Sequence, residues 1–340
     1  MLLLCNYYLT YRCNAFCEFC HFGIHENFKD TPYAKLEDFK SNVEQIKKLG
    51  AKFIDLTGGE PLLHKEIHLM AEFAKGLNFQ TSITTNALLY PKFAERLSGN
   101  IDLLHFSLDS PDEEEHNRIR KVNCYKKVFE SIEIAKSLGE FPDILFTVTN
   151  ETYTKLPRMH ELAAEKDLVL IVNPVFSYWG NPGLSDEAIN YIEEYTDSKL
   201  DIYTNKGFLK LRKNGGNDIN NPSCKAVTRV IVISPYNEII LPCYHFESEK
   251  IKIYRPIAEI RNSEKIKYFK EMEGRFDFCK GCTVNCYFEP SFAFPTNLYA
   301  ISSLTSKFKY GYNKLIKQKF KKKFGNHPDL SREISNPESV

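Results

Sequence analysis

The sequence lacks a charge excess of either sign: 45 lysines and arginines stand against 44 acidic residues, for a formal net charge of +1. A chain so close to neutral has no bulk attraction to nucleic acid. It also lacks an apolar run approaching the roughly 20 residues of a membrane span, and Met1–Leu4 is too short for the apolar region of a signal peptide. These absences predict a globular protein of the reducing cytoplasm.

Cysteine, in contrast, is abundant, with ten residues in 340. Eight of them fall in close clusters or paired spacings, which favour metal binding over disulfides in a chain without a signal peptide. The remaining two, Cys5 and Cys124, lie in apolar strand and helix contexts. We expect these two to be small core residues.

The first half of the sequence alternates short apolar runs with helical periodicity. We predict strands at residues 1–9, 53–57, 79–84, 101–108, 143–148 and 168–172, and helices at 36–49, 67–77, from 91 onward, 124–138 and 156–166. Six strand–helix units require parallel strands joined by crossover helices, so the fold class is α/β. An open six-strand barrel and a flat doubly wound sheet fit this pattern equally.

Near residue 180 the regular alternation of strand and helix patterns ends, and turn and loop signals become frequent. We predict a short helix at 186–195 and a hairpin with strands at 227–234 and 238–241. The expected organisation is a core at 1–180, a linker and cysteine-bearing module at 181–290, and a basic tail at 291–340.

The organising motif is Cys13-x3-Cys17-x2-Cys20, directly after the first predicted strand. Three thiolates this close hold three irons of a cubane cluster and leave the fourth iron open. A zinc knuckle completed by His21, or a structural group, is the alternative. With aromatic Phe19 before the last cysteine, the motif resembles the cluster loop of the radical S-adenosylmethionine (SAM) superfamily.

The resemblance implies a partial (β/α)6 barrel that binds a catalytic [4Fe–4S] cluster through three cysteines and SAM at the open iron. It also implies that one electron cleaves SAM to a 5′-deoxyadenosyl radical, which takes hydrogen from an unactivated carbon. A diglycine turn after the second strand is similar to the family's GGEP element. Polar residues at later strand ends resemble its SAM contacts, although each could also be an ordinary turn former. The implied SAM-binding residues are Phe19, Thr57, Gly58, Gly59, Glu60, Asn86, Ser107, Asp109 and Arg120. Thr149 or Asn150 and residues 172–175 are candidates for adenine contacts.

The second half adds five cysteines, Cys224, Cys243, Cys279, Cys282 and Cys286. A hairpin flanked by cysteines and followed by Cys-x2-Cys is similar to the auxiliary modules called twitch and SPASM. This likeness implies an auxiliary [4Fe–4S] cluster on the first four, with Cys286 spare, although Cys286 could replace one of them or leave an iron open. Structural zinc is the alternative reading. The run 282–290 also resembles the C-terminal region of adenosylhopene synthase-type enzymes, which act on a lipid.

The tail has eight lysines and no acid between Thr305 and Phe324, and apolar residues recur there on one face of a helix. This amphipathic helix either lies on a membrane surface or packs its apolar face on the barrel with its lysines solvated. RNA binding is a third alternative.

The sequence as a whole predicts a radical SAM enzyme that abstracts hydrogen from a small or lipid-like substrate, with flavodoxin or ferredoxin as the electron donor. The expected compartment is the cytoplasm, with or without peripheral contact at the inner face of the membrane. Because the cluster loop comes so early, we expect no preceding peptide-recognition domain. The alternatives are a maturase that oxidises or cross-links a ribosomal peptide, and a non-catalytic iron–sulfur electron carrier or scaffold.

Overall fold

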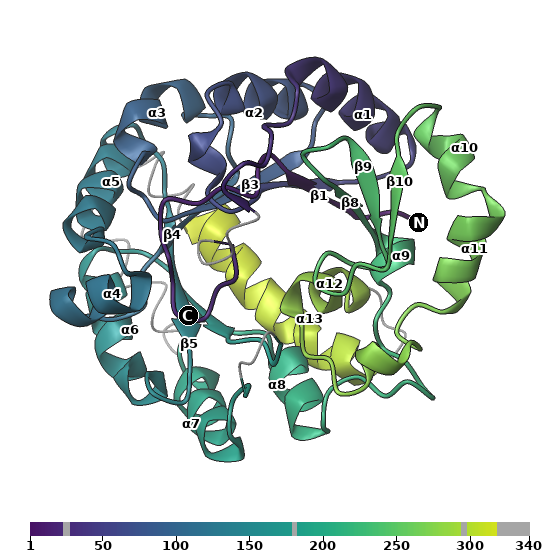
Figure 1. Cartoon of the computed structure of the whole chain (residues 1–340). Helices are drawn as coiled ribbons and strands as arrows, with labels where there is room; N and C mark the ends of the chain where they lie inside the picture. Colours follow the sequence, from purple (N-terminus) through teal and green to yellow (C-terminus); the bar gives the residue numbers. More distant parts are fainter. Residues whose placement is uncertain (23–27, 179–181, 294–297, 318–340) are drawn as a thin grey trace, which may run out of the picture.

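The computed structural model describes residues 1–22, 28–178, 182–293 and 298–317, with the backbone alone at 315–317. One ten-stranded sheet organises these residues, in the order β10-β9-β8-β1-β2-β3-β4-β5-β6-β7. Strands β1 to β6 lie in the sheet in the order of the chain and pair in parallel, and the helices between them form an outer ring (Figure 1). This arrangement confirms the predicted α/β partial barrel, which ends at the edge strands β10 and β7 and does not close.

The strands of the sheet have the following bounds: β1 Leu4–Tyr8, β2 Phe53–Thr57, β3 Gln80–Thr85, β4 Leu103–Ser107, β5 Asp143–Val148, β6 Leu170–Pro174, β7 Ile202–Tyr203, β8 Val230–Ile233, β9 Glu238–Leu241 and β10 Glu249–Lys252.

The helices have the following bounds: α1 Leu36–Lys48, α2 Ile67–Gly76, α3 Tyr90–Leu97, α4 Glu113–Arg120, α5 Tyr125–Ser137, α6 Leu156–Glu165, α7 Asp186–Asp197, α8 Lys206–Lys213, α9 Ala226–Arg229, α10 Ile257–Arg261, α11 Glu264–Glu271, α12 Asn285–Ser291 and α13 Leu298–Gly311. Short 3-10 turns lie at Pro61–Leu63, Tyr153–Lys155 and Asp277–Cys279, and the π-helical segment η5 spans Tyr312–Lys317.

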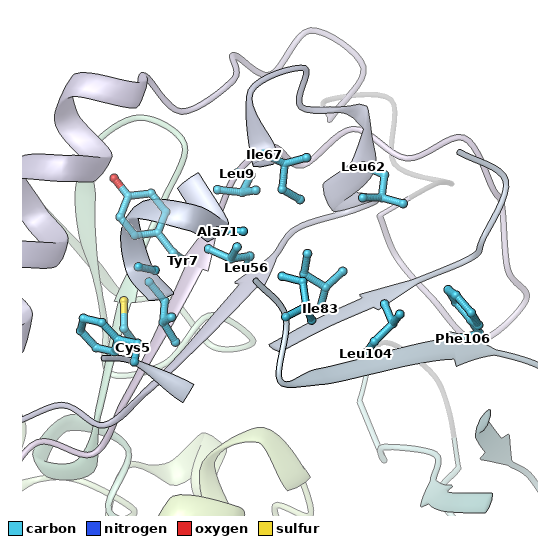
Figure 2. Close-up of a cluster of buried hydrophobic side chains, with 14 of the residues drawn as sticks. Cys5, Tyr7, Leu9, Leu56, Leu62, Ile67, Ala71, Ile83, Leu104 and Phe106 are labelled. Atoms are coloured by element: carbon cyan, nitrogen blue, oxygen red, sulfur yellow. The ribbon is translucent and has the colours of Figure 1, made fainter. Parts of the chain in front are cut away.

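The main core lies between the convex side of the sheet and the outer helices. Successive strand residues point to opposite faces, so Ile83 of β3 and Leu104 and Phe106 of β4 face the helices, as Figure 2 shows. Cys5 joins this cluster, and Cys124 is buried as well, which confirms both as core residues. The strand residues that alternate with these helix-facing ones therefore face the concave side, where the barrel would hold a ligand.

The second half of the chain continues this sheet. The predicted hairpin is present as β8 and β9, although residues 227–229 of its first predicted strand lie in helix α9. Strand β8 also pairs in parallel with β1, with Cys5 opposite Ile231. The strand β10 then adds to β9 in antiparallel orientation. The cysteine-bearing module is thus joined to the core by backbone hydrogen bonds between β8 and β1.

Helix α13 crosses beneath the ring of strands (Figure 1). Lys314 of η5 forms a buried ion pair with Asp143, the first residue of β5, at 2.9 Å, and Tyr310 donates to the same carboxylate at 2.6 Å. The tail therefore covers the N-terminal ends of the barrel strands. Within the residues that the structure describes, no helix has both the length and the hydrophobicity to cross a bilayer.

Candidate active site

The three cysteines of the first motif lie on a loop that follows β1, at the carboxyl end of the strand. The end of α4 binds this loop from one side: Phe16 N–H donates to Arg120 O at 3.1 Å and Glu18 N–H to Ile119 O at 3.0 Å. The last carbonyls of a helix have no partner within the helix, so they are free to accept from a neighbouring loop. Cys17 is buried, while Cys13 and Cys20 keep partial exposure.

Local sequence explains why α4 ends there. Asp112 caps the helix by accepting from Glu115 N–H at 2.9 Å, and three glutamates occupy its first turn, where negative charge is favourable. Lys121 then adopts a left-handed conformation, with φ of 52°, and ends it. Arg120, in the last turn, therefore lies beside the cysteine loop.

The diglycine turn after β2 holds the other side of the same loop. A Cβ atom at Gly58 would lie 2.2 Å from Thr10 O, and one at Gly59 would lie 2.2 Å from Arg12 O. Gly59 N–H donates to Thr10 O at 3.0 Å, and Glu60 N–H to Arg12 O at 2.9 Å. Glycine is therefore required because the chain's own cysteine loop approaches so closely, whereas the sequence suggested approach by a ligand.

Glu60 is buried and joins the segments at the ends of β2 and β3. Its carboxylate accepts from Leu62 N–H at 3.0 Å, Thr85 Oγ1 at 2.8 Å and Asn86 N–H at 2.9 Å. Asn86 in turn donates through Nδ2 to Asn14 Oδ1 of the cysteine loop at 2.8 Å. Through these bonds Glu60 positions Asn86, and Asn86 holds the cysteine loop in place. Asn14, which the sequence did not single out, belongs to the same set.

Asp109 and Arg120 form a buried ion pair, with Arg120 Nε 2.5 Å from Asp109 Oδ2. The guanidinium also lies 3.6 Å from Cys17 Sγ and packs over the Phe19 ring at 5.7 Å. Because Asp109 is close, the pKa of Arg120 is raised even though burial opposes the charge. Positive charge is thus held beside the cysteines. Arg118, by contrast, forms an exposed ion pair with Glu18.

A cavity of about 230 Å³ opens next to this ion pair. Phe19, Asp109, Thr147, Asn150 and Val175 are among the residues that line it. It includes residues that the sequence indicated for adenine contacts, at the ends of the fifth and sixth strands. Of the remaining predicted SAM contacts, Ser107 is buried and Thr57 is half-buried on the same carboxyl edge.

Four of the five C-terminal cysteines line one small, enclosed cavity: Cys224, Cys243, Cys279 and Cys282. They come from three separate segments, and Asn217 and Gly274 complete the wall. The donor set and its enclosure fit an auxiliary [4Fe–4S] cluster. In the described parts of the chain, no three Cys, His, Asp or Glu side chains are gathered tightly enough for a single metal ion.

Cys286 is absent from that cavity. It lies on α12 inside the ring of strands (Figure 1) and keeps exposed surface. Because the barrel wall surrounds this surface, desolvation raises the pKa of the Cys286 thiol to about 12, and the charge of Asp55 on β2 adds to the shift. Cys286 thus faces the concave side of the sheet. Burial also raises the pKa of Cys20 and of Cys279 to about 11, so metal binding must displace protons from these thiols.

The concave face of the strands is polar, a feature that the sequence did not reveal. Ser82 donates to Asp55 Oδ1 at 2.6 Å, and Thr84 Oγ1 lies 3.3 Å from His105 Nδ1. Burial raises the pKa of Asp55 to about 6, although bonds from Ser82 and Thr57 oppose the shift. Burial lowers the pKa of His105 to about 4, so its imidazole is neutral at pH 7. Neutral polar groups and the Asp55 carboxylate therefore face the barrel interior, and the Asp143 carboxylate lies 3.6 Å from His105 Nε2 at the start of β5.

Comparison with known proteins places these features in context. Residues 7–163 match the family model of the radical SAM superfamily. Over 293 residues the chain is 26% identical to a protein named "Probable GTP 3′,8-cyclase" from Methanococcus maripaludis strain C5, covering 80% of this chain and 94% of that protein.

Two solved structures share the fold. The structure of anSMEcpe with bound AdoMet superposes with a TM-score of 0.62 at 20% identity, over 93% of this chain and 95% of that one. The structure of Streptococcus suis SuiB bound to precursor peptide SuiA superposes with a TM-score of 0.64 at 17% identity, over 83% and 70%. At these identities the likeness concerns the fold alone.

Proposed function

We propose that the chain is a radical SAM enzyme that abstracts hydrogen from a polar substrate, on the premise that residues 7–163, which match the radical SAM family model, form its catalytic domain. When bound, a [4Fe–4S] cluster would supply the electron that cleaves SAM to a 5′-deoxyadenosyl radical, with flavodoxin or ferredoxin as the donor. Cys13, Cys17 and Cys20 would hold the cluster.

The observation that supports this proposal best is the convergence of separate segments on one cysteine loop. The diglycine turn binds its start, Asn86 its middle and the end of α4 its last part. A purely structural loop would not need a buried arginine 3.6 Å from one of its thiols. Arg120 suits either a thiolate-bound anionic cluster or the carboxylate of SAM. The adjoining cavity of about 230 Å³ suits an adenosine group between Phe19 and Val175.

The remaining residues prepare the site for radical chemistry. Backbone bonds to Glu60 and the Asp109–Arg120 pair keep the loop in one conformation before ligands arrive. The buried apolar layer beneath the strands excludes water from the convex side. Cys224, Cys243, Cys279 and Cys282 would hold the auxiliary cluster, and Cys286 would face the substrate.

The concave face favours a polar substrate over a lipid-like one. Asp55 and Ser82 bond to each other, as do Thr84 and His105, and these pairs make the face polar, so it offers an acyl chain little apolar surface. The name of the relative from Methanococcus maripaludis supports a small, polar molecule of nucleotide type. A ribosomal peptide is the second candidate substrate, because a polar face also suits a peptide backbone. The structural neighbour SuiB is bound to a precursor peptide.

The test uses anaerobically reconstituted protein, wild type against a Cys13/Cys17/Cys20→Ala variant. We expect about eight irons in the wild type and about four in the variant. With SAM and dithionite, only the wild type should release 5′-deoxyadenosine. A fully loaded wild type that leaves SAM intact would instead support the electron-carrier alternative. Nucleoside triphosphates and a peptide pool are then compared for substrate-dependent 5′-deoxyadenosine formation.

A further inference from the structure

Helix α8 buries the guanidinium of Arg212, a residue that is only 8% exposed. Its Nη1 donates to Asn285 Oδ1 at 3.0 Å, and its Nη2 donates to Thr283 O at 3.0 Å and to Pro174 O at 3.4 Å. All of these acceptors are neutral. Within the described residues no Asp or Glu acts on the charge of Arg212, and the ionisable group that favours this charge is the Cys282 thiol.

The lack of an acid sets Arg212 apart from the other buried lysines and arginines of the described chain. Each of those has an acid nearby: Asp109 for Arg120, Asp143 for Lys314 and Glu273 for Arg261. A buried charge is costly unless an opposite charge compensates it. Burial lowers the pKa of Arg212 to about 10, so the side chain still carries its charge at pH 7. The compensating anion therefore has to form at the cysteine that lies beside it.

The guanidinium is held next to the auxiliary cysteines by the backbone. Thr283, whose carbonyl it binds, directly follows Cys282 in the chain. The loop after α8 is tied to the same place, because Asn217 N–H donates to Cys282 O at 3.0 Å. Burial raises the pKa of the Cys282 thiol, whereas the Val284 N–H and the charge of Arg212 oppose that rise. Arg212 thus stabilises negative charge on one of the four cysteines that line the enclosed cavity.

The group proposed for that cavity is an anion. Four thiolates outweigh the positive charge of a [4Fe–4S] core, and the cluster becomes more negative when its core takes up an electron. A nearby buried cation stabilises the reduced form more than the oxidised form, because attraction grows with the negative charge. A four-thiolate zinc site would also be an anion, but zinc takes up no electron.

We propose that Arg212 is the counter-cation of the auxiliary [4Fe–4S] cluster and raises its reduction potential. This inference rests on the proposed function, which assigns that cluster to Cys224, Cys243, Cys279 and Cys282. One electron passes from the reductant to the cluster core, no bond to Arg212 forms or breaks, and the guanidinium keeps its protons. Arg212 acts on the reaction only through the cluster, as a positioning residue does.

The test isolates the auxiliary cluster in the Cys13/Cys17/Cys20→Ala variant, which should hold about four irons. The reduction potential is measured by anaerobic titration with dithionite, followed by electron paramagnetic resonance of the reduced cluster. In this background Arg212→Gln removes the charge and keeps a donor for Thr283 O. We expect its potential to fall by at least about 59 mV, which is a tenfold smaller ratio of reduced to oxidised cluster at a fixed potential. Arg212→Lys keeps the charge and should retain most of the potential of the background protein.

The matched control is Arg275→Gln in the same background. Arg275 belongs to the same module and also donates to backbone carbonyls, those of Ile219 and Asn220, but it is exposed, so water screens its charge. This variant should keep the potential of the background protein, and an equal fall in Arg275→Gln and Arg212→Gln would overturn the proposal.

The proposal is also overturned if Arg212→Gln holds about four irons at an unchanged potential. If Arg212→Gln and Arg212→Lys both lose the iron, it is overturned as well, because shape and not charge would then hold the site. Iron loss in Arg212→Gln alone supports it. Zinc in place of iron overturns both this inference and the auxiliary cluster of the proposed function, whereas release of 5′-deoxyadenosine by the wild type tests the catalytic cluster independently.

Discussion

The substitution Gly59→Ala is the sharpest test of the site architecture. The new Cβ would lie 2.2 Å from Arg12 O, 2.6 Å from Arg12 C and 2.8 Å from Tyr11 O. All three are backbone atoms, so no side-chain rotation can relieve the overlap. Overpacking of this kind costs about 1–3 kcal/mol. Two hydrogen bonds to Thr10 and Arg12 would also be lost, at about 0.5–1.5 kcal/mol each. The free energy of unfolding should fall by about 2–6 kcal/mol.

The assay is urea unfolding of the metal-free protein, followed by circular dichroism, together with iron counts after reconstitution. Because Arg12 directly precedes Cys13, Gly59→Ala should lose the catalytic cluster and keep about four irons at the auxiliary cysteines. The matched control is Gly76→Ala, at the end of α2, where nothing lies within 4 Å of the added methyl group. This control should be neutral or up to about 1 kcal/mol more stable.

Wild-type stability and iron content in Gly59→Ala would refute the claim that the turn is shaped by the cysteine loop. Equal losses in Gly59→Ala and Gly76→Ala would refute it as well, because they would indicate a general intolerance of substitution. A stable Gly59→Ala protein that binds both clusters but no longer cleaves SAM would instead support the approach of a ligand to the glycine.

Three further predictions concern the barrel interior. Burial raises the pKa of Asp55 from 3.8 to about 6, so stability should fall as pH rises from about 4 to 6. Asp55→Asn should flatten this fall and be about 1–3 kcal/mol more stable at pH 7 in urea titrations, whereas an unchanged slope would contradict the assignment. Lys314→Met should cost about 3–5 kcal/mol because it leaves the buried Asp143 carboxylate without its cation. The added change Asp143→Asn should recover part of the loss, and a neutral Lys314→Met would contradict the buried pair. Cys286→Ser should keep the auxiliary iron that Cys243→Ser loses, and iron loss in both would place Cys286 among the ligands.

The barrel strands could be predicted well because each is a short apolar run bounded by turn residues. The bounds of β2 and β5 match the prediction at both ends. Helix α4 was missed, since only His116, Ile119 and Arg120 of its residues are buried and hydrophobic periodicity has nothing to detect. Its signal was the capping aspartate followed by three glutamates.

The candidate site was predictable in its motifs but not in its internal contacts. The spacing of the cysteines identified the loop, yet the bond between Asn86 and Asn14 joins residues 72 positions apart. For the tail, too, the sequence pattern did not reveal a contact between distant residues. Its periodicity placed Phe308 and Tyr312 on one face, but the outward direction of that face depends on a pair between Lys314 and Asp143, 171 residues away. At Phe308 and Tyr312, which are exposed, the alternative of an apolar face packed on the barrel is wrong; the remaining residues of the predicted face lie outside the described side chains.

The parallel pairing of β1 with β8 has a consequence for synthesis. Strand β1 gains its first neighbour once β2 has emerged from the ribosome, but its other edge stays unpaired until Val230–Ile233 appear. At about 5–20 residues per second, the roughly 170 intervening residues take on the order of 10 to 35 seconds. Throughout that interval the nascent chain presents an open strand edge between Cys5 and the cysteine loop, a template for pairing with other chains. A chaperone that shields this edge would raise the yield of folded protein more than it would for a barrel whose first strand is paired early.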